Sequence, residues 1–429
     1  MNKYRKHKNR GTALPLALVA IIILLTMGTT LLSMGVNNRI FSMRNVSTIT
    51  ARCAADAGLT QALFEMNEKL QNKTLEISML PSTWRANLLD CDAMYSYMVV
   101  GNLGAGYTIY SLGEADNSQR TVRATIGLKG LFDHAILTKE TLTLKSGTVI
   151  DAYNSSNPGD TDLTVQIGTQ STADSSVILN SGVLVDGDVV VGVNGDTDTV
   201  IKDLGATVNG DKIVSTEPQS FNKISPPALP IMGTSLTVKS GVLSITSDDN
   251  GEYTSIDLQS GKDIGVLEIA KGDVVLHITG DIDLDNSCEI VVKDGATLTL
   301  YVDGDITCGN GSGINTEAPP QEASTLQLYA TGEGEQFLDV KAKSEWTGVI
   351  YAPEADVVLY ANGDAYGSIV ADGFEFKSGG NFHYDKALQE VDVDDQGVTF
   401  TVTRWYEGRL NLAEMEMELG VDELMLKGN

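Results

Sequence analysis

The hydrophobic pattern of this chain begins with one uncharged run near the N-terminus. Residues 11–38 carry no charged side chain, and the 23 residues 13–35 are predominantly apolar. A membrane-spanning helix needs about 20 such residues, because a helix satisfies its own backbone hydrogen bonds in lipid. The pattern therefore predicts a transmembrane helix over residues 12–36. A secretory signal peptide is the alternative, but its apolar core typically covers only about 7–15 residues.

A helical pattern continues beyond this span. Apolar residues recur at spacings of three and four while polar residues take the other face, and the apolar set is Ala55, Leu59, Ala62, Leu63, Met66 and Leu70. This periodicity predicts an amphipathic stem helix over residues 37–75, continuous with the transmembrane helix. Its apolar stripe needs a folded domain to cover it.

Period-two alternation then predicts short strands. Residues 106–113 and 119–127 have this pattern, and residues 114–118 between them are rich in turn formers. A further run, residues 95–100, precedes them. Such strands could cover the stem helix, so we expect a small α+β unit whose β part spans residues 76–130. One further strand is predicted over residues 398–405, before an acidic tail.

The segment 131–388 has a different sequence pattern, in which short β-rich runs alternate with Gly, Asp and Asn. GDIDLDNSCEI from Gly280 aligns with GDITCGNGSGI from Gly304 at an offset of 24 residues, so that Ile282 matches Ile306 and Leu284 matches Cys308. Short strands at a fixed period are typical of a solenoid, in which each coil buries its inward side chains against the next. We therefore predict a right-handed parallel β-solenoid, with a β-sandwich as the alternative. Residues 216–233 hold four of the ten prolines and should lie outside the coils.

The chain is thus expected to be mainly β, with six consecutive parts. These are a basic leader (1–11), a transmembrane helix (12–36), an amphipathic stem helix (37–75), a β unit (76–130), a β-solenoid (131–388), and a C-terminal strand with an acidic tail (389–429).

The charge distribution indicates topology and excludes some partners. The net charge is −27, although five basic residues precede the apolar span. Positive charge on that side predicts a cytoplasmic N-terminus, with most of the chain on the other side of a bacterial membrane. An acidic surface repels nucleic acid, so we expect no such partner. Lipid should be contacted through residues 12–36.

Candidate chemistry is sparse. The four cysteines form no CxxC pair and allow three disulfide pairings or none, and no histidine has the spacing of a zinc ligand. Six carboxylates sit in or beside Gly-Asp steps, where a turn is the first interpretation, calcium binding a weaker one, and glycosidase catalysis the weakest. They are Asp186, Asp188, Asp281, Asp283, Asp303 and Asp305. We therefore predict no catalytic, cofactor-binding or metal-binding residue.

Two other groups of residues were considered as sites. His277 and His383 lie in strand-like segments, and core packing is the first interpretation of an aromatic set that could instead form a binding strip. That set is Trp346, Tyr351, Tyr360, Tyr366 and Tyr384. No arginine occurs between residues 124 and 403, which removes one basic group that extracellular polysaccharide lyases commonly use.

Two segments resemble a known family. RGTALPLALVAIIILLTMGTTLLSMG followed by AADAGLTQALFEMN resembles the N-terminal region of PilX-type minor pilins and K-type pseudopilins. Residues 345–388, from EWTGVIYAPEA onward, resemble a β-helix-like domain of undefined activity that is fused to such stems. The resemblance implies leader cleavage between Gly11 and Thr12 and other pilin-like subunits as partners. Major pilins have a glutamate where Leu16 would stand in the mature chain, so a shaft subunit is not implied.

Two functions follow as expectations. The favoured one is a non-enzymatic, membrane-anchored, pilin-like surface component that displays a β-solenoid for adhesion, assembly or spacing, with a glycan or protein as ligand. The alternative is a membrane-tethered β-helix enzyme that acts on extracellular polysaccharide.

Overall fold

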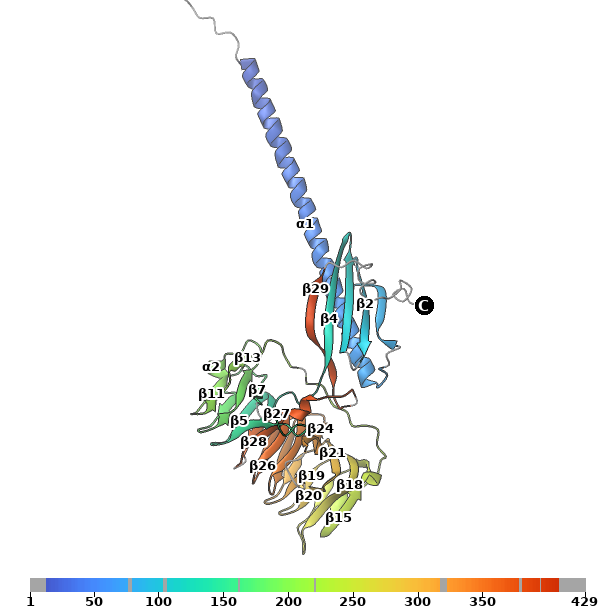
Figure 1. Ribbon diagram of the computed structural model, residues 1–429, viewed down its shortest axis with the longest axis vertical. Coiled ribbons are helices and arrows are strands. Elements are labelled where there is room, and N and C mark those ends of the chain that lie inside the picture. The colour runs from blue at the N-terminus through green and yellow to red at the C-terminus, as the bar shows by residue number, and fades with distance from the viewer. Residues whose placement is uncertain are drawn as a thin grey trace, which may run out of the picture. The chain divides into compact units, whose positions relative to one another are not determined.

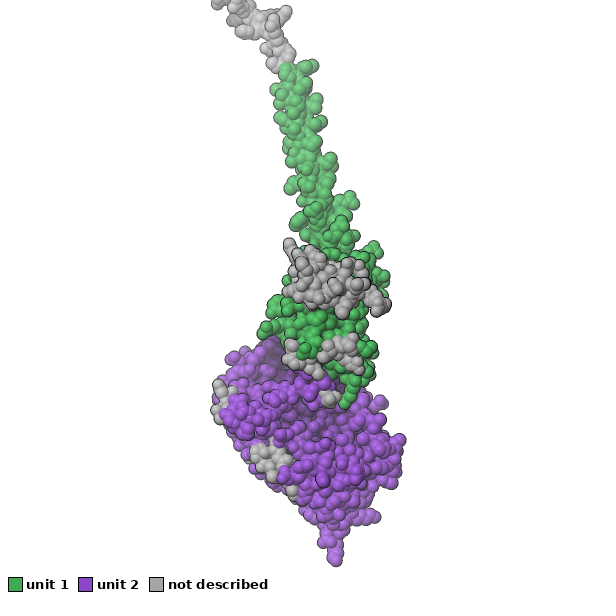
Figure 2. Space-filling view, turned by 45° about the vertical axis from the view of Figure 1, so that its right-hand side comes forward, with its two compact units in different colours: residues 1–127, 400–429 green, residues 128–399 purple. Residues whose placement is uncertain are grey.

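The computed structural model describes residues 13–75, 79–102, 106–160, 163–219, 221–316, 322–377, 380–393 and 395–408. The chain divides into two compact units, of which unit 1 comprises residues 1–127 and 400–429 and unit 2 comprises residues 128–399 (Figure 2). The predicted basic leader and most of the predicted acidic tail lie outside the described residues.

Unit 1 is built on one long helix, α1 (Ala13–Gln71), so the transmembrane and stem segments form a single element (Figure 1). Side chains 14–46 are all exposed. The predicted apolar stripe is confirmed at its buried members, which are Ala55, Leu59, Ala62, Met66 and Leu70. Leu63 is only half-buried and lies at the margin of the stripe.

The sheet of unit 1 has the strand order β1-β2-β3-β4-β29. Its strands are β1 (Ser82–Asn87), β2 (Ala93–Asn102), β3 (Gly106–Ala115), β4 (Ser118–Lys129) and β29 (Thr399–Gly408). The four predicted strands are present and longer than expected, whereas β1 was not predicted. Strands β1 to β4 pair antiparallel, and α1 packs mainly on β3 and β2. Because β29 neighbours β4, the segment between them, unit 2, is an insertion into this sheet.

Unit 2 is a parallel β-solenoid whose chain winds in two stretches. The first comprises β5 (Ile136–Leu144), β6 (Val149–Tyr153), β7 (Val165–Thr169), β8 (Val177–Leu179), β9 (Leu184–Val185), β10 (Gly187–Val191), α2 (Thr197–Val200), β11 (Ile201–Asp203), β12 (Thr207–Val208) and β13 (Lys212–Val214). The second begins with β14 (Leu236–Val238), β15 (Gly241–Thr246), β16 (Gly251–Tyr253), β17 (Ile256–Leu258), β18 (Gly265–Ile278), β19 (Ile282–Leu284), β20 (Glu289–Val292) and β21 (Ala296–Val302). It continues with β22 (Ile306–Cys308), β23 (Gly313–Thr316), β24 (Leu326–Ala330), β25 (Gln336–Ala342), β26 (Trp346–Ala361), β27 (Ala365–Phe376) and β28 (Phe382–Asp385).

The predicted repeat is confirmed by the strand register. Ile282 pairs with Ile306 and Leu284 with Cys308, and all four side chains face the core. Every described ladder between named strands of unit 2 is parallel, so the alternative of a β-sandwich, which is built from antiparallel strands, is wrong. Buried aliphatic side chains from all coils form one continuous core.

The two stretches meet at a seam in the middle of the solenoid. β27 and β28 of the last coil pair in parallel with β5 and β6 of the first coil. Figure 1 shows β5 beside β28, with β13 near one end of the solenoid and β15 at the other. The chain therefore winds outward from the seam to β13, crosses to β14, and winds back to the seam. The sequence analysis did not predict this permuted order.

The crossing segment, residues 215–235, lies outside the coils over its first part, as predicted for residues 216–233. Its end does not, because Ile231 forms a parallel bridge with Glu252 of β16 and thereby joins the coils. Ile224 of the crossing segment belongs to a second apolar cluster, which also includes Tyr301 and Tyr329, and Phe221 packs against this cluster. The carbonyl of Asn222 also accepts a hydrogen bond from the Tyr351 hydroxyl at 2.8 Å. The crossing segment therefore packs against the solenoid at this cluster.

Candidate functional site

The exposed half of α1 is the strongest functional surface in the described chain. Among the described residues, one helix is long and apolar enough to span a membrane, with a mean hydropathy of 2.4 and none of its apolar window buried. Exposing so much apolar surface to water is unfavourable. Large exposed apolar patches therefore mark sites that contact lipid or another protein. Gly11 and Thr12, the expected processing site, lie outside the described residues.

Residues 51–58 of α1 lie close to β3 of the sheet. The carbonyl of Ala55 accepts a hydrogen bond at 2.7 Å from the Ser111 hydroxyl of β3. On the same strand, a Cβ added to Gly113 would lie only 1.9 Å from the carbonyl oxygen of Ala51. The small residues of the AADAG segment, which carries part of the family resemblance, thus let helix and sheet backbones approach closely.

The Gly-Asp steps form corners that recur from coil to coil. At four of these corners an aspartate Oδ1 accepts a hydrogen bond from the backbone N–H at the equivalent position of the next coil. These bonds run from Asp211 to Asp188 (2.8 Å), Asp305 to Asp281 (2.9 Å), Phe337 to Asp305 (2.9 Å) and Asn381 to Asp364 (2.7 Å). These carboxylates therefore lie at corners, as the turn interpretation predicts, but they bond to the neighbouring coil and not to their own backbone, and Gly280, Gly304 and Gly363 do not have a positive φ.

Glycine is required at these corners by close stacking. A Cβ on Gly304 would lie 2.5 Å from the carbonyl carbon of Gly280 in the preceding coil. Backbone this close leaves no room for any side chain. Gly and Asp therefore act together, one by allowing the contact and the other by bonding across it.

The remaining candidate carboxylates differ in their surroundings. Asp186 accepts a hydrogen bond from the Asn209 amide at 2.9 Å. Asp283 faces outward between Asp257 and other acids, and partial burial with these neighbouring charges raises its pKa. Within the described residues, no group of three or more His, Cys, Asp or Glu side chains is arranged to hold a metal ion. The expectation of no metal or cofactor stays a prediction.

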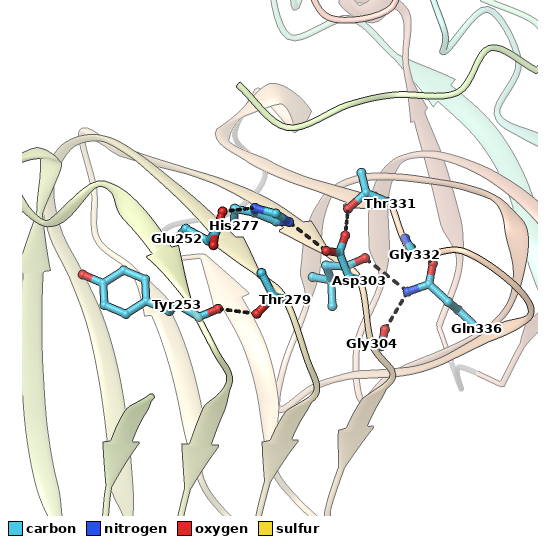
Figure 3. Close-up of polar contacts among 10 residues, drawn as sticks. Glu252, Tyr253, His277, Thr279, Asp303, Gly304, Thr331, Gly332 and Gln336 are labelled. Atoms are coloured by element: carbon cyan, nitrogen blue, oxygen red, sulfur yellow. Dashed lines mark hydrogen bonds and ion pairs between the residues drawn. The ribbon is translucent and has the colours of Figure 1, made fainter. Parts of the chain in front are cut away.

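Asp303 belongs to a polar chain that links four successive coils (Figure 3). His277 on β18 lies between two carboxylates, with its Nδ1 3.3 Å from Glu252 Oε2 and its Nε2 2.9 Å from Asp303 Oδ2. Asp303 also accepts a hydrogen bond from the Thr331 hydroxyl at 2.7 Å. Both imidazole nitrogens are occupied, so this histidine is placed to hold coils together rather than to bind a substrate.

A second histidine bridges the seam of the solenoid. His383 on β28 contacts Asp151 on β6 through Nδ1, and its Nε2 lies 3.6 Å from Asp364. Burial of the ring opposes its charge, but the hydrogen bond and charge of Asp151, aided by Asp364, raise its pKa above the usual value. The imidazole also stacks on Tyr366, with ring centroids 4.7 Å apart.

The seam is also held by a buried carboxylate. Asp385 accepts hydrogen bonds from the Ser155 hydroxyl at 2.7 Å and from the backbone N–H groups of Ser155, Ala323 and Ala387. Sequence reasoning did not single it out, because its partners lie as far as 230 residues away.

The aromatic residues do not form a binding strip. Trp346, Tyr351 and Tyr384 are buried, Tyr366 stacks at the seam, and Tyr360 is exposed elsewhere on the solenoid. Core and rung stacking is therefore confirmed for the buried members. The cysteines are free thiols, of which Cys53 is exposed, Cys91 half-buried, and Cys288 and Cys308 buried.

One cavity of about 280 Å³ lies in unit 2. Its apolar wall includes Leu131, Phe132 and Tyr329, while Glu322 and Glu390 contribute carboxylates to its lining. The sequence offered no signal for it, since these residues come from three distant segments.

Comparisons with known proteins give limited information. Residues 233–391 match the family described as "Domain of unknown function (DUF7305)". No curated protein matches the chain.

Two solved structures are similar at low level. A competence-associated pilin, ComZ, from Thermus thermophilus is 12% identical with a TM-score of 0.26, covering 85% of this chain and 98% of that one. An ice binding protein from an Antarctic bacterium, Flavobacteriaceae, is 10% identical with a TM-score of 0.17, covering 58% of this chain and 79% of that one. Likeness at these scores carries no argument about fold or function. The chain is thus similar, over residues 233–391, to a family whose function is unknown.

Proposed function

We propose that this chain is a membrane-anchored, pilin-like surface component that displays its β-solenoid outside the membrane. The observation that carries the proposal is the continuity of α1, whose first half is bare and apolar and whose second half is buried on a sheet. Residues 13–35 would measure about 35 Å as a helix, enough for a hydrocarbon core of about 30 Å. The basic residues 3–10 would stay in the cytoplasm.

A non-enzymatic role in adhesion, assembly or spacing is the finer part of this proposal. Its support is that Asp188, Asp281 and Asp305 are committed to backbone hydrogen bonds at the corners. A second line of support is that Tyr301 and Tyr329 are buried in a cluster that Ile224 of the crossing segment joins. The ligand would be a glycan or protein, and pilin-like subunits would be further partners.

Membrane anchoring is tested by placing one charge in the span. Leu24→Lys puts an ammonium near its middle, at a cost of about 2.5–3.5 kcal/mol for insertion, and should move the protein out of the carbonate-resistant membrane fraction. Phe64→Lys is the matched control, because Phe64 is also an exposed apolar residue of α1 but lies in the packed half. Equal membrane retention of both variants would refute the anchor.

Orientation and processing are tested on intact cells. Added protease should digest the solenoid, and its full protection would reverse the orientation. N-terminal sequencing of the membrane fraction should give Thr12 as the first residue. A start at Met1 would mean an uncleaved anchor, and a start beyond Gly35 would mean a discarded signal. A glycan-degradation screen that found turnover abolished by one carboxylate substitution would favour the enzyme instead.

A further inference from the structure

A short part of α1 keeps exposed apolar side chains even if residues 13–35 fill a bilayer, although its end is half-buried at Ser47, Thr48 and Thr50 and Ser47 donates a hydrogen bond to Asp116. This part, residues 36–50, is here called the neck. A helix rises 1.5 Å per residue, so the neck extends about 22 Å beyond the span. It carries four large apolar side chains that are at least 60% exposed, namely Phe41, Met43, Val46 and Ile49. This surface lies beyond the span, where an exposed apolar patch marks contact with a protein segment.

The neck is also basic. Arg39 and Arg44 are its charged residues, and no carboxylate lies between residues 36 and 50. Within the part of the chain that the structure describes, neither arginine forms an ion pair. A partner for the neck must therefore combine apolar and acidic side chains.

At its sheet-proximal end the neck opens into a hollow of unit 1. This hollow has a volume of about 360 Å³ and is lined by Thr48, Ile49, Arg52, Arg120, Glu407 and Gly408. Arg52 is engaged by Glu407 at 3.5 Å and lies over the Trp405 ring at 5.7 Å. Arg120 has no carboxylate partner among the described residues. The hollow thus has an apolar floor at Ile49 and a spare guanidinium.

Gly408 is the last described residue of β29, so the chain continues directly from this hollow. Residues 409–429 alternate apolar and acidic residues, reading RLNLAEMEMELGVDELMLKGN. Glu414, Glu416 and Glu418 alternate with methionine and leucine, which matches a surface that carries both arginine and exposed apolar groups. Even at a helical rise of 1.5 Å, 21 residues reach about 31 Å, further than the neck.

We propose that residues 409–429 dock on the neck of α1. The apolar residues of this segment would cover Ile49, Val46 and their apolar neighbours. The glutamates would pair with Arg39, Arg44 and Arg120. The inference rests on the proposed function in one respect, that only residues 13–35 lie in lipid.

Thiol labelling of the full chain in detergent tests this docking. The background carries Cys53→Ser and Cys91→Ser, while the two buried cysteines stay. With Val46→Cys added, a maleimide should label position 46 at least about tenfold more slowly than in the same chain carrying Lys at positions 414, 416 and 418. Tenfold corresponds to about 1.4 kcal/mol of docking free energy. Adding Arg39→Glu and Arg44→Glu to the lysine variant should restore slow labelling.

Controls separate the tail from other coverings of the neck. Phe64→Cys, on the packed half of α1, should label equally fast with either tail. Equal labelling rates at position 46 with both tails would overturn the proposal. Two equally fast rates would mean that nothing covers the neck, and two equally slow rates would mean that detergent covers it. Protection that depends on protein concentration would assign the neck to a second copy and also overturn it. A failed membrane anchor would appear in the fractionation experiment and not here.

Discussion

The contact between α1 and β3 leaves no room for one methyl group at Gly113. In the Gly113→Ala variant the new Cβ would stand 1.9 Å from Ala51 O and 2.4 Å from Ala55 N. Both are helix backbone atoms, so no rotamer change relieves the contact. Ordinary van der Waals contact needs about 3.5 Å, and α1 must therefore move away from the sheet by more than an ångström.

The cost follows from what this movement breaks. Overpacking a core typically costs about 1–3 kcal/mol, and separation also weakens the hydrogen bond from Ser111 to Ala55, worth about 0.5–1.5 kcal/mol. We expect a total of about 2–4 kcal/mol. This corresponds to roughly 30- to 700-fold faster exchange wherever amide exchange occurs by opening of this unit.

Hydrogen–deuterium exchange of β3 and of residues 51–70 measures this effect without interference from unit 2. Gly127→Ala on β4 is the matched control, because its Cβ would meet only the Thr403 methyl, at 3.1 Å. The control should change exchange little, while Gly113→Ala should accelerate it in both segments. Parent-like exchange in Gly113→Ala would show that α1 does not lie on β3 at this distance.

Three further predictions concern the solenoid, each read from its melting temperature. Ile306→Asp buries an unpaired charge and should cost several kcal/mol, whereas Thr307→Ser on the exposed side should not; a parent-like Ile306→Asp would refute the register. Asp281→Ala removes the acceptor for the next coil's N–H and should cost about 1 kcal/mol, while Asp281→Asn retains most stability; equal losses would place the effect elsewhere. The pKa of His383 is raised from 6.5 by Asp151, so its stabilisation is complete below that value and declines as pH rises through the higher folded pKa. His383→Gln should remove this decline, and an unchanged pH profile would contradict the bridge.

The sequence pattern predicted those features of the fold that depend on residues close together in the chain. The 24-residue offset placed Ile282 on Ile306 because neighbouring coils repeat the same corner and the same inward positions. The helical periodicity likewise identified most of the buried stripe of α1. These features depend on spacing within a few dozen residues, which a single sequence displays directly.

Pairing between strands that are far apart in the chain could not be predicted from the sequence pattern. Nothing in residues 136–153 indicates that β5 and β6 pair with β27 and β28, since any coil of this solenoid offers similar edges. The same holds for Asp385 and His383, whose bonding partners lie about 230 residues away. The approach of α1 to Gly113 was equally hidden, because a glycine in a strand-like segment signals only that something comes close.

The insertion of unit 2 between β4 and β29 dictates the order in which the protein can be completed. Asn67 of α1 exchanges hydrogen bonds with the backbone of Phe400, 333 residues later, so unit 1 stays open until the entire solenoid has been synthesised. The seam delays folding within unit 2 in a similar way, because β5 and β6 of the first coil can pair only after β27 and β28 of the last coil have been synthesised. Contacts this distant in sequence slow folding and prolong exposure of unpaired strand edges. A truncated chain would therefore leave α1 without its last strand, so completion of unit 1 reports that synthesis has reached β29.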